Sequence, residues 1–174
     1  MDFMKKYEYW LNSDSIDEKD KEELRGLKDN PKEIEDRFFK DLSFGTGGIR
    51  GVRGIGTNRI NKYVIRKATQ GLANYMLTFN EKEAKEQGII IAHDCRIGSR
   101  EYALNTARVM AANGIKAYIY EDLRSTPELS FGVRYKGTMA GIVVTASHNP
   151  VEYNGYKVYW NDGAQVVDPH ATLI

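Results

Sequence analysis

Gly141-Ile142-Val143-Val144-Thr145-Ala146-Ser147-His148-Asn149-Pro150 is the stretch that decides the fold of this chain. It opens with an apolar, mostly β-branched run, which is typical of a strand buried on both faces of a sheet. Pro150 holds Asn149 extended and prevents the strand from continuing, so we expect a loop at the carboxyl end of the strand. Open α/β sheets place their ligands at such an edge, which makes Ser147 the first candidate for chemistry.

Strands and helices alternate along the chain ahead of this stretch. Apolar runs predict strands at 88–92 and 115–120, besides the one at 139–145. Apolar residues at helical spacing after Asn61 predict a first helix. A second helix should end at Asn113-Gly114, and a third should begin at Thr126-Pro127. This alternation implies right-handed βαβ units. The predicted fold class is therefore α/β, a three-layer α/β/α domain with a mainly parallel mixed sheet.

Both ends of the chain depart from this alternation. Residues 1–43 read as a charged, helical N-terminal extension packed on the domain of residues 44–174. We expect its helices to start at a capping box beginning at Ser15 and at Asn30-Pro31. Residues 157–167 predict two short strands around an Asn161-Asp162-Gly163 hairpin turn.

The last residues predict one more helix. Asp168-Pro169 is typical of an N-cap followed by proline at the first helical position, yet only five residues follow. We therefore expect this chain to be a fragment of a longer protein.

Composition excludes several classes of protein. A net charge of +1 with interspersed acids and bases argues against nucleic acid as a partner. No apolar run approaches the ~20 residues of a spanning helix, and no secretory signal opens the chain. The single cysteine, Cys95, forms no internal disulfide and is expected to be a buried bystander. We expect a soluble, cytoplasmic protein without a membrane partner.

A serine next to a histidine could indicate a serine hydrolase. In extended chain, however, neighbouring side chains point to opposite sides, so His148 should not act as a base on Ser147. The G-x-S-x-G elbow is also absent. A purely structural turn is the other reading of this loop.

A glycine-rich segment at 44–51 (Phe-Gly-Thr-Gly-Gly-Ile-Arg-Gly) is the second candidate site. Glycines let backbone N–H groups approach an anion closely, and Arg50 can bind phosphate with two hydrogen bonds. Neither the P-loop nor the dinucleotide fingerprint fits, because the required Gly-Lys-Ser/Thr is missing and Arg50 and Arg59 occupy the final glycine positions.

Together, Thr-Ala-Ser-His-Asn-Pro at 145–150, Asn-Gly-Tyr-Lys at 154–157 and the 44–51 segment resemble the α-D-phosphohexomutases, the phosphoglucomutase/phosphomannomutase family. The segment at 93–99 resembles the D-x-R segment of that family. Its Asp94 and Arg96 should hold the loop around Ser147 in place. The resemblance covers the first of four family domains, and the N-terminal helices fit the branch that includes bacterial phosphoglucomutases.

The resemblance implies phosphoryl transfer through a phosphoserine. Ser147 would carry the phosphoryl group, while Lys157, with His148, would exchange the proton of the sugar hydroxyl. Thr46, Arg50 and Asn149 would contact phosphate or sugar. At Gly47 several relatives carry serine, so only a backbone contact is expected there.

The resemblance also implies a cofactor and partners. Phosphorylated Ser147 would be one ligand of Mg²⁺, and the family's other ligands lie in an Asp-Gly-Asp-x-Asp-Arg loop that this chain lacks. Glucose 1,6-bisphosphate would act as activator, a hexose phosphate as substrate, and the remaining domains as partners in the same polypeptide. We expect the isolated chain to fold without mutase activity.

Several functions stay open at this point. Phosphoglucomutase, which interconverts glucose 1-phosphate and glucose 6-phosphate, is the first interpretation. Phosphomannomutase, phosphopentomutase or a hexosamine-phosphate mutase would use the same mechanism. A non-catalytic phosphosugar-binding domain is the alternative from another class.

Overall fold

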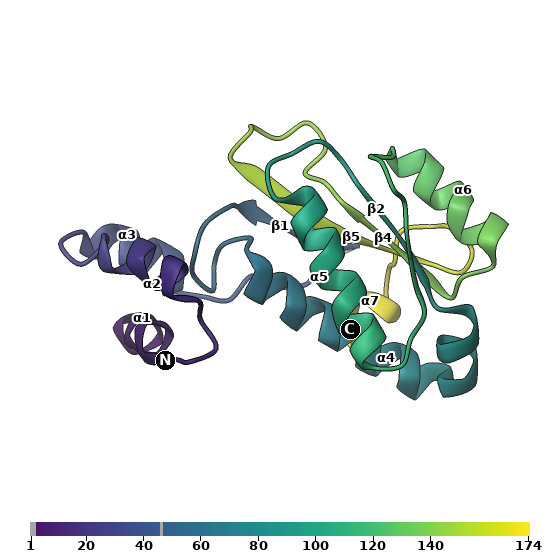
Figure 1. Ribbon diagram of the computed structural model, residues 1–174, viewed down its shortest axis with the longest axis horizontal. Helices are drawn as coiled ribbons and strands as arrows, with labels where there is room; N and C mark the ends of the chain where they lie inside the picture. The colour runs from purple at the N-terminus through teal and green to yellow at the C-terminus, as the bar shows by residue number, and fades with distance from the viewer. Residues whose placement is uncertain (1–2, 46) are drawn as a thin grey trace.

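The computed structural model describes residues 3–45 and 47–174 (Figure 1). In this part of the chain, three helices precede the first strand, strands and helices then alternate up to β4, and β5 follows β4 directly. The elements are α1 (Phe3–Asn12), α2 (Glu18–Arg25), α3 (Pro31–Phe38), β1 (Gly48–Val52), α4 (Lys62–Gln87), β2 (Ile89–His93), α5 (Ser99–Ala112), β3 (Ala117–Ile119), α6 (Thr126–Lys136), β4 (Ala140–Val144), β5 (Tyr153–Trp160) and α7 (His170–Leu173). No helix among the described residues is long and apolar enough to cross a bilayer.

The five strands form one mixed sheet in the order β1-β5-β4-β2-β3. The strands predicted from the apolar runs are β2, β3 and β4, and β2 pairs in parallel with the other two. β5 then runs antiparallel to β4 on one side and to β1 on the other. The predicted α/β class with a mixed sheet is confirmed.

Helices cover both faces of the sheet, which produces three layers (Figure 1). Ile142 and Val144 of β4 face the larger core, which the sheet shares with α4 and α5. Val143, between them, faces the smaller core beneath α6. All three side chains are almost fully buried, and burial of each contributes roughly 1.5–3 kcal/mol.

Helix boundaries follow the predicted local signals in the middle of the chain. Asn61 caps α4 by accepting hydrogen bonds from two backbone N–H groups. α5 ends at Asn113-Gly114, where Gly114 has a positive φ. Ser125, directly before the predicted Thr126-Pro127 start, forms a complete capping box with Glu128.

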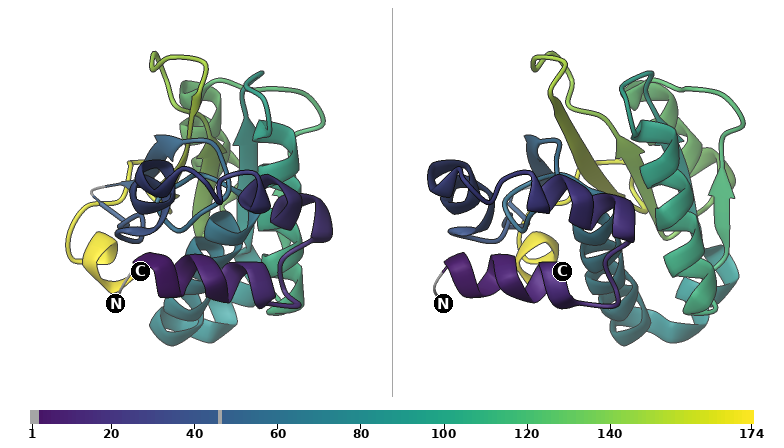
Figure 2. Two further views of the ribbon diagram at one scale, coloured as in Figure 1. Left: turned by 90° about the vertical axis from the view of Figure 1, so that its left-hand side faces the viewer. Right: turned by 60° about the vertical axis from the view of Figure 1, so that its left-hand side comes forward.

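The N-terminal helices have a small core of their own, which lies to one side of the sheet (Figure 2). Leu24, Ile34 and Phe38 are fully buried in it, and Ile55 from the segment after β1 joins them. Arg59 Nη2 lies 2.5 Å from Asp36 Oδ2, which fixes the same segment to α3.

Two details of this extension differ from the sequence-based expectation. α1 precedes the two expected helices. The expected capping box at Ser15 is wrong, because α2 begins at Glu18 with Asp17 at the N-cap position and no side-chain cap. The Asp17 carboxylate instead accepts a hydrogen bond from Lys62 on α4, a tertiary contact that replaces the local one.

The C-terminal elements also need correction. β5 begins at Tyr153 and is a central strand of eight residues, and beyond the turn only a single bridge joins Tyr159 to Gln165. The expected pair of short strands is therefore wrong, although the chain does turn at Gly163. At α7 the N-cap is Pro169 rather than Asp168, whose carboxylate accepts a hydrogen bond from the Thr172 hydroxyl instead.

Candidate functional site

Ser147 stands on a strained turn just beyond β4. Thr145 and Ala146 are still buried, whereas Ser147 is exposed. Its φ of 57° makes it the one described residue other than glycine in the left-handed region. Its N–H donates to Thr145 Oγ1 at 3.0 Å, which helps to hold this conformation. Backbone strain of this kind is concentrated at functional sites, and here it presents a hydroxyl to solvent.

The turn brings His148 closer to Ser147 than an extended chain would. Ser147 Oγ and His148 Nδ1 are 3.4 Å apart. The expectation that the two side chains point to opposite sides is wrong, because it assumed extended backbone at Ser147. No carboxylate of the described residues pairs with His148, so the third group of a hydrolase triad is not seen in this part of the chain.

Arg96 holds the Ser147 loop through its backbone carbonyls. Arg96 Nη2 donates to the carbonyls of Ser147 at 2.9 Å and Asn149 at 2.6 Å. Its Nη1 donates to Pro150 and Tyr153. One guanidinium thus connects four carbonyls of the loop, which is the tie expected for the D-x-R segment.

Asp94, directly after the neighbouring strand β2, fixes Arg96, and its Oδ2 lies 3.4 Å from the guanidinium Nε. Its Oδ1 accepts hydrogen bonds from the Arg96 N–H at 2.9 Å and from Ser99 Oγ at 2.6 Å. Its own N–H donates to the Val144 carbonyl, the last of β4. The loop is therefore anchored to β2, to β4 and to the start of α5.

Antiparallel pairing places Arg50 and Lys157 on one face of the sheet. Gly48 opposes Lys157 and Arg50 opposes Gly155, and residues two apart in a strand share a face. Arg50 Nη1 also donates to Asn149 Oδ1 at 2.8 Å, which links the Ser147 loop to β1. Ser147, His148, Asn149 and Arg50 are therefore together, and Lys157 joins them through Arg50.

The electrostatics of this group favour an anion. Partial burial lowers the pKa of Lys157, and the positive charge of Arg50 lowers it further. Among the described residues, no carboxylate forms an ion pair with Arg50, His148 or Lys157. Cations left unpaired beside an exposed hydroxyl can bind and stabilise a phosphate.

Comparison with known proteins places this chain in a family. Residues 41–174 match the model of the phosphoglucomutase/phosphomannomutase α/β/α domain I. This chain belongs to the phosphoglucomutase/phosphomannomutase family. The members of the family act as isomerases that transfer phosphate, and this chain corresponds to domain I.

Curated relatives support the same assignment. The phosphoglucomutase of Staphylococcus haemolyticus is 46% identical over 132 residues, which are 76% of this chain and 23% of that protein. The phosphoglucomutase of Staphylococcus aureus strain USA300 is 43% identical over 145 residues, which are 82% of this chain and 26% of that protein. The chain thus spans about a quarter of the length of these relatives.

Solved structures agree in fold. A candidate phosphomannomutase of Thermus thermophilus has a TM-score of 0.68 and 26% identity, covering 77% of this chain and 29% of that one. A phosphoglucomutase/phosphomannomutase family protein of Burkholderia thailandensis has a TM-score of 0.58 and 26% identity, covering 75% and 28%.

Within this family domain, Gly47 has a local explanation. Thr46 lies outside the described residues. Gly47 has a φ of 80°, and its carbonyl accepts hydrogen bonds from Val158 N and Gln165 Nε2. A Cβ at this position would lie 2.0 Å from Gln165 Nε2, so a serine would displace that side chain.

Two residues of the Asn-Gly-Tyr-Lys motif have roles that the sequence did not reveal. A Cβ on Gly155 would lie 2.7 Å from the Thr145 carbonyl oxygen and 2.9 Å from that of Ile49, so only glycine lets the three strands approach. Asn154 is fully buried and donates to Ser99 Oγ at 2.9 Å. The motif itself is the available signal, although the resemblance implies a role for Lys157 alone.

Cys95 takes no part in this site. It is exposed, so the expectation that it is buried is wrong. It follows Asp94 in the turn between β2 and α5, where its side chain faces outward.

Proposed function

We propose that the longer protein carrying this chain is a phosphoglucomutase, which interconverts glucose 1-phosphate and glucose 6-phosphate through a phosphoserine and a bisphosphorylated sugar. The observation that carries the proposal is the exposed hydroxyl of Ser147 on a strained turn beside unpaired cations. The names of the curated relatives support glucose as the sugar.

In the proposed reaction a phosphoryl group passes from Ser147 to a sugar hydroxyl. The bond between phosphorus and the serine oxygen breaks as a bond to the sugar oxygen forms. The hydroxyl proton passes to neutral Lys157 Nζ, and the serine oxygen leaves with the electron pair of the broken bond and takes up a proton from solvent. The lowered pKa of Lys157 raises the fraction of the neutral amine near physiological pH. The reverse transfer, from the other position of the sugar bisphosphate, regenerates phosphorylated Ser147 and completes the isomerisation.

The other residues would hold charge and position. Phosphoryl transfer depends mainly on in-line placement and on neutralising the phosphoryl oxygens. We assign that role to Arg50 and Asn149, whose side chains are already hydrogen-bonded to each other. His148 would share in proton transfer or orient the sugar, and Thr46 and the backbone of Gly47 would complete the phosphate contacts.

Mg²⁺ would neutralise charge on the transferred group. A phosphate on Ser147 supplies one oxygen ligand, which suits this hard cation. The described residues include no group of three His, Cys, Asp or Glu side chains that could hold a metal, and two arginines, Arg50 and Arg96, donate to the loop that carries Ser147. This part of the chain therefore does not fit a complete magnesium site, and we propose that the other ligands come from further domains.

The remaining partners follow from the same proposal. Glucose 1,6-bisphosphate would activate the enzyme by phosphorylating Ser147, and the hexose phosphate would bind between this domain and the others of the polypeptide. We place the enzyme in the cytoplasm, without nucleic acid or membrane as a partner. The chain alone would show no mutase turnover.

Phosphomannomutase is the second candidate. The structural relative from Thermus thermophilus carries that name, and the family model covers both activities. Rates of the complete protein with glucose 1-phosphate and mannose 1-phosphate would distinguish the two.

The phosphorylation state of Ser147 tests the proposal. After incubation of the complete protein with glucose 1,6-bisphosphate and Mg²⁺, we expect phosphate on the peptide that contains Ser147. Ser147→Gly should abolish both phosphate and turnover while keeping the fold, because glycine adopts the left-handed conformation readily. Ser15→Ala, at another exposed serine, is the matched control. Full turnover in Ser147→Gly would refute the phosphoserine mechanism and leave a binding domain.

A further inference from the structure

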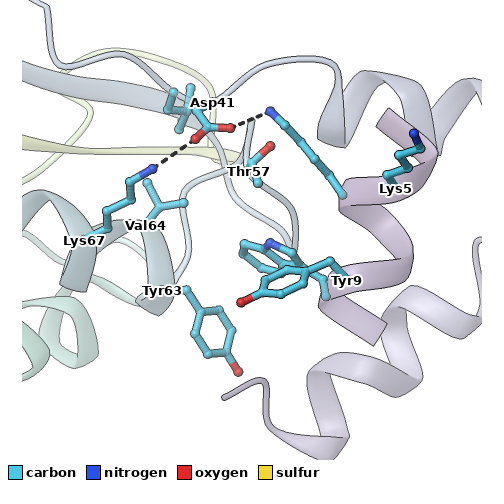
Figure 3. A pocket seen from close by; sticks show the side chains of 10 residues that line it. Lys5, Tyr9, Asp41, Thr57, Tyr63, Val64 and Lys67 are labelled. Carbon is cyan, nitrogen blue, oxygen red and sulfur yellow. Dashed lines mark hydrogen bonds and ion pairs between the residues drawn. The ribbon is translucent and has the colours of Figure 1, made fainter. Parts of the chain in front are cut away.

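A cavity of about 560 Å³ lies between the N-terminal helices and the start of α4 (Figure 3). Its size falls in the range of small-molecule sites, and no residue of the Ser147 loop lines it. Tyr9 and Trp10 of α1 form one wall, outside the residues that match the family model. Leu42 and Val64, which lie inside that match, form the facing wall.

The walls are apolar and one of them is held rigidly in place. Trp10 packs edge-on against Phe38 and Tyr63, with ring centroids 5.7 and 5.4 Å away. Tyr9, beside it, leaves 71% of its surface exposed. Exposed aromatic surface beside a preformed hollow is typical of a binding site, because a planar ligand can cover it without rearranging the protein.

Positive charge surrounds the mouth of the cavity. Asp41 accepts hydrogen bonds from Lys6 Nζ at 2.7 Å and from Lys67 Nζ at 3.0 Å, the two dashed lines of Figure 3. Burial alone would raise the pKa of Asp41, but the two lysines outweigh it and lower the pKa. Lys5 adds a third ammonium group to the lining, so lysines outnumber the single carboxylate.

The single negative charge of Asp41 cannot neutralise both Lys6 and Lys67, so one positive charge remains available to another anion. The Lys67 side chain is 77% exposed although it is paired. Exposed ion pairs of this kind contribute about 0–1 kcal/mol, so an incoming acid could share Lys67 at little cost. Lys5 is exposed on the opposite side of the cavity and points away from Lys67, so it adds positive charge without contacting the same anion (Figure 3).

We propose that this cavity binds a small aromatic acid, with its ring between Trp10 and Val64 and its anionic group at Lys67, beside Lys6. A hexose phosphate would suit it less well, because the Trp10, Leu42 and Val64 walls offer carbon rather than hydrogen-bond partners to most of the sugar hydroxyls. The ligand therefore differs in class from the substrate proposed for the Ser147 site, and neither proposal depends on the other.

Such a ligand would join the N-terminal helices to the family domain. It contacts both α1 and α4, so it binds only when the helices are packed in place. By mass action, binding then stabilises this packing in proportion to the logarithm of ligand concentration. The site would regulate how firmly the N-terminal helices are attached.

The test uses the 174-residue chain and a pair of matched fluorescent probes. The probes are 8-anilinonaphthalene-1-sulfonate, an aromatic acid, and the neutral N-phenyl-1-naphthylamine. We expect one sulfonate probe to bind per chain, with energy transfer from Trp10 that is lost in Trp10→Phe. Lys67→Gln should weaken the sulfonate roughly two- to fivefold and leave the neutral probe unchanged. Lys82→Gln, on the same helix but outside the cavity, is the control for charge.

A second variant tests the location without changing charge. Val64→Trp should fill the cavity and weaken both probes at least tenfold, while circular dichroism confirms an intact fold. No saturable binding, equal affinity of the sulfonate in Lys67→Gln and the original chain, or tighter binding of the neutral probe would overturn the proposal. A Val64→Trp chain that unfolds leaves the decision to Lys67→Gln and Trp10→Phe.

Discussion

Arg96→Met removes the guanidinium that holds the Ser147 loop but keeps most of the apolar stem. The side chain is only 14% exposed, and it donates to the carbonyls of Ser147, Asn149, Pro150 and Tyr153 at 2.6–3.2 Å. The loop has little apolar burial to replace these bonds, because Ser147, His148 and Pro150 are exposed. We therefore expect the substitution to release the loop and to destabilise the domain.

The size of the effect follows from the four hydrogen bonds. A bond from a charged donor is worth about 1.5–3 kcal/mol when it is protected from water, and less where water can replace the donor. The carbonyls lie in a partly exposed loop, so we count about 0.5–1 kcal/mol for each and expect a loss of about 2–4 kcal/mol in the free energy of unfolding. For a chain of this length that corresponds to a fall in Tm of roughly 4–16 °C.

Urea unfolding and amide hydrogen exchange measure the two parts of this effect. Exchange should accelerate most at residues 145–153 and least in the buried strands β2 and β4. Arg96→Lys should recover only part of the loss, because an ammonium group cannot span four carbonyls. Arg100→Met, at an exposed neighbouring arginine, should stay within about 0.5 kcal/mol of the original chain. A loss below that limit in Arg96→Met, with unchanged exchange in the loop, would refute the reasoning.

Gly155→Ala should lower the free energy of unfolding in urea by about 1–3 kcal/mol, because its Cβ would lie 2.7 and 2.9 Å from two backbone carbonyl oxygens. Unchanged stability would show that the strands can move apart to accept the Cβ. Arg50→Gln should raise the pKa of Lys157, because a neighbouring positive charge is lost, and an NMR titration of the Lys157 Cε measures this change. Burial, the larger cause of the shift, should still keep that pKa below its ordinary value. Phe38→Ala should cost about 3–5 kcal/mol, since Phe38 is fully buried, whereas half-exposed Phe39→Ala should cost far less.

Much of the fold could be predicted because its signals are local. The run of β-branched residues in β4 is buried at every position, as the strand pattern predicted. Asn61 and Ser125 begin their helices because each accepts hydrogen bonds from N–H groups within a few residues. Such signals need no knowledge of the rest of the chain.

The errors lie where a distant partner overrides a local signal. Asp17 binds Lys62, 45 residues away, and so leaves its helix uncapped. The strand around Lys157 was predicted to begin there, whereas β5 already begins at Tyr153. In the structure, Asn154 is buried against Ser99, and Gly155 lets β1 and the end of β4 approach.

The candidate site shows the same division. The sequence motifs indicated Ser147, Arg50 and Lys157, and the structure brings Arg50 to both the Ser147 loop and Lys157. The Ser147 turn is held in part by Arg96, 51 residues away, and the bond from Arg50 to Asn149 depends on the register of strands β1 and β5. No local pattern contains either contact.

The position of β1 has a consequence for how the domain is made. β1 lies at the edge of the sheet and pairs only with β5, and the paired residues Gly51 and Asn154 are 103 positions apart in the chain. Contacts of such long range form slowly, because a long loop must close before they stabilise anything. During synthesis, β1 must wait for most of the domain to leave the ribosome before it finds its partner. The N-terminal helices, whose contacts are closer in sequence, can pack earlier, so Arg50 would reach the Ser147 loop in one of the last steps of folding.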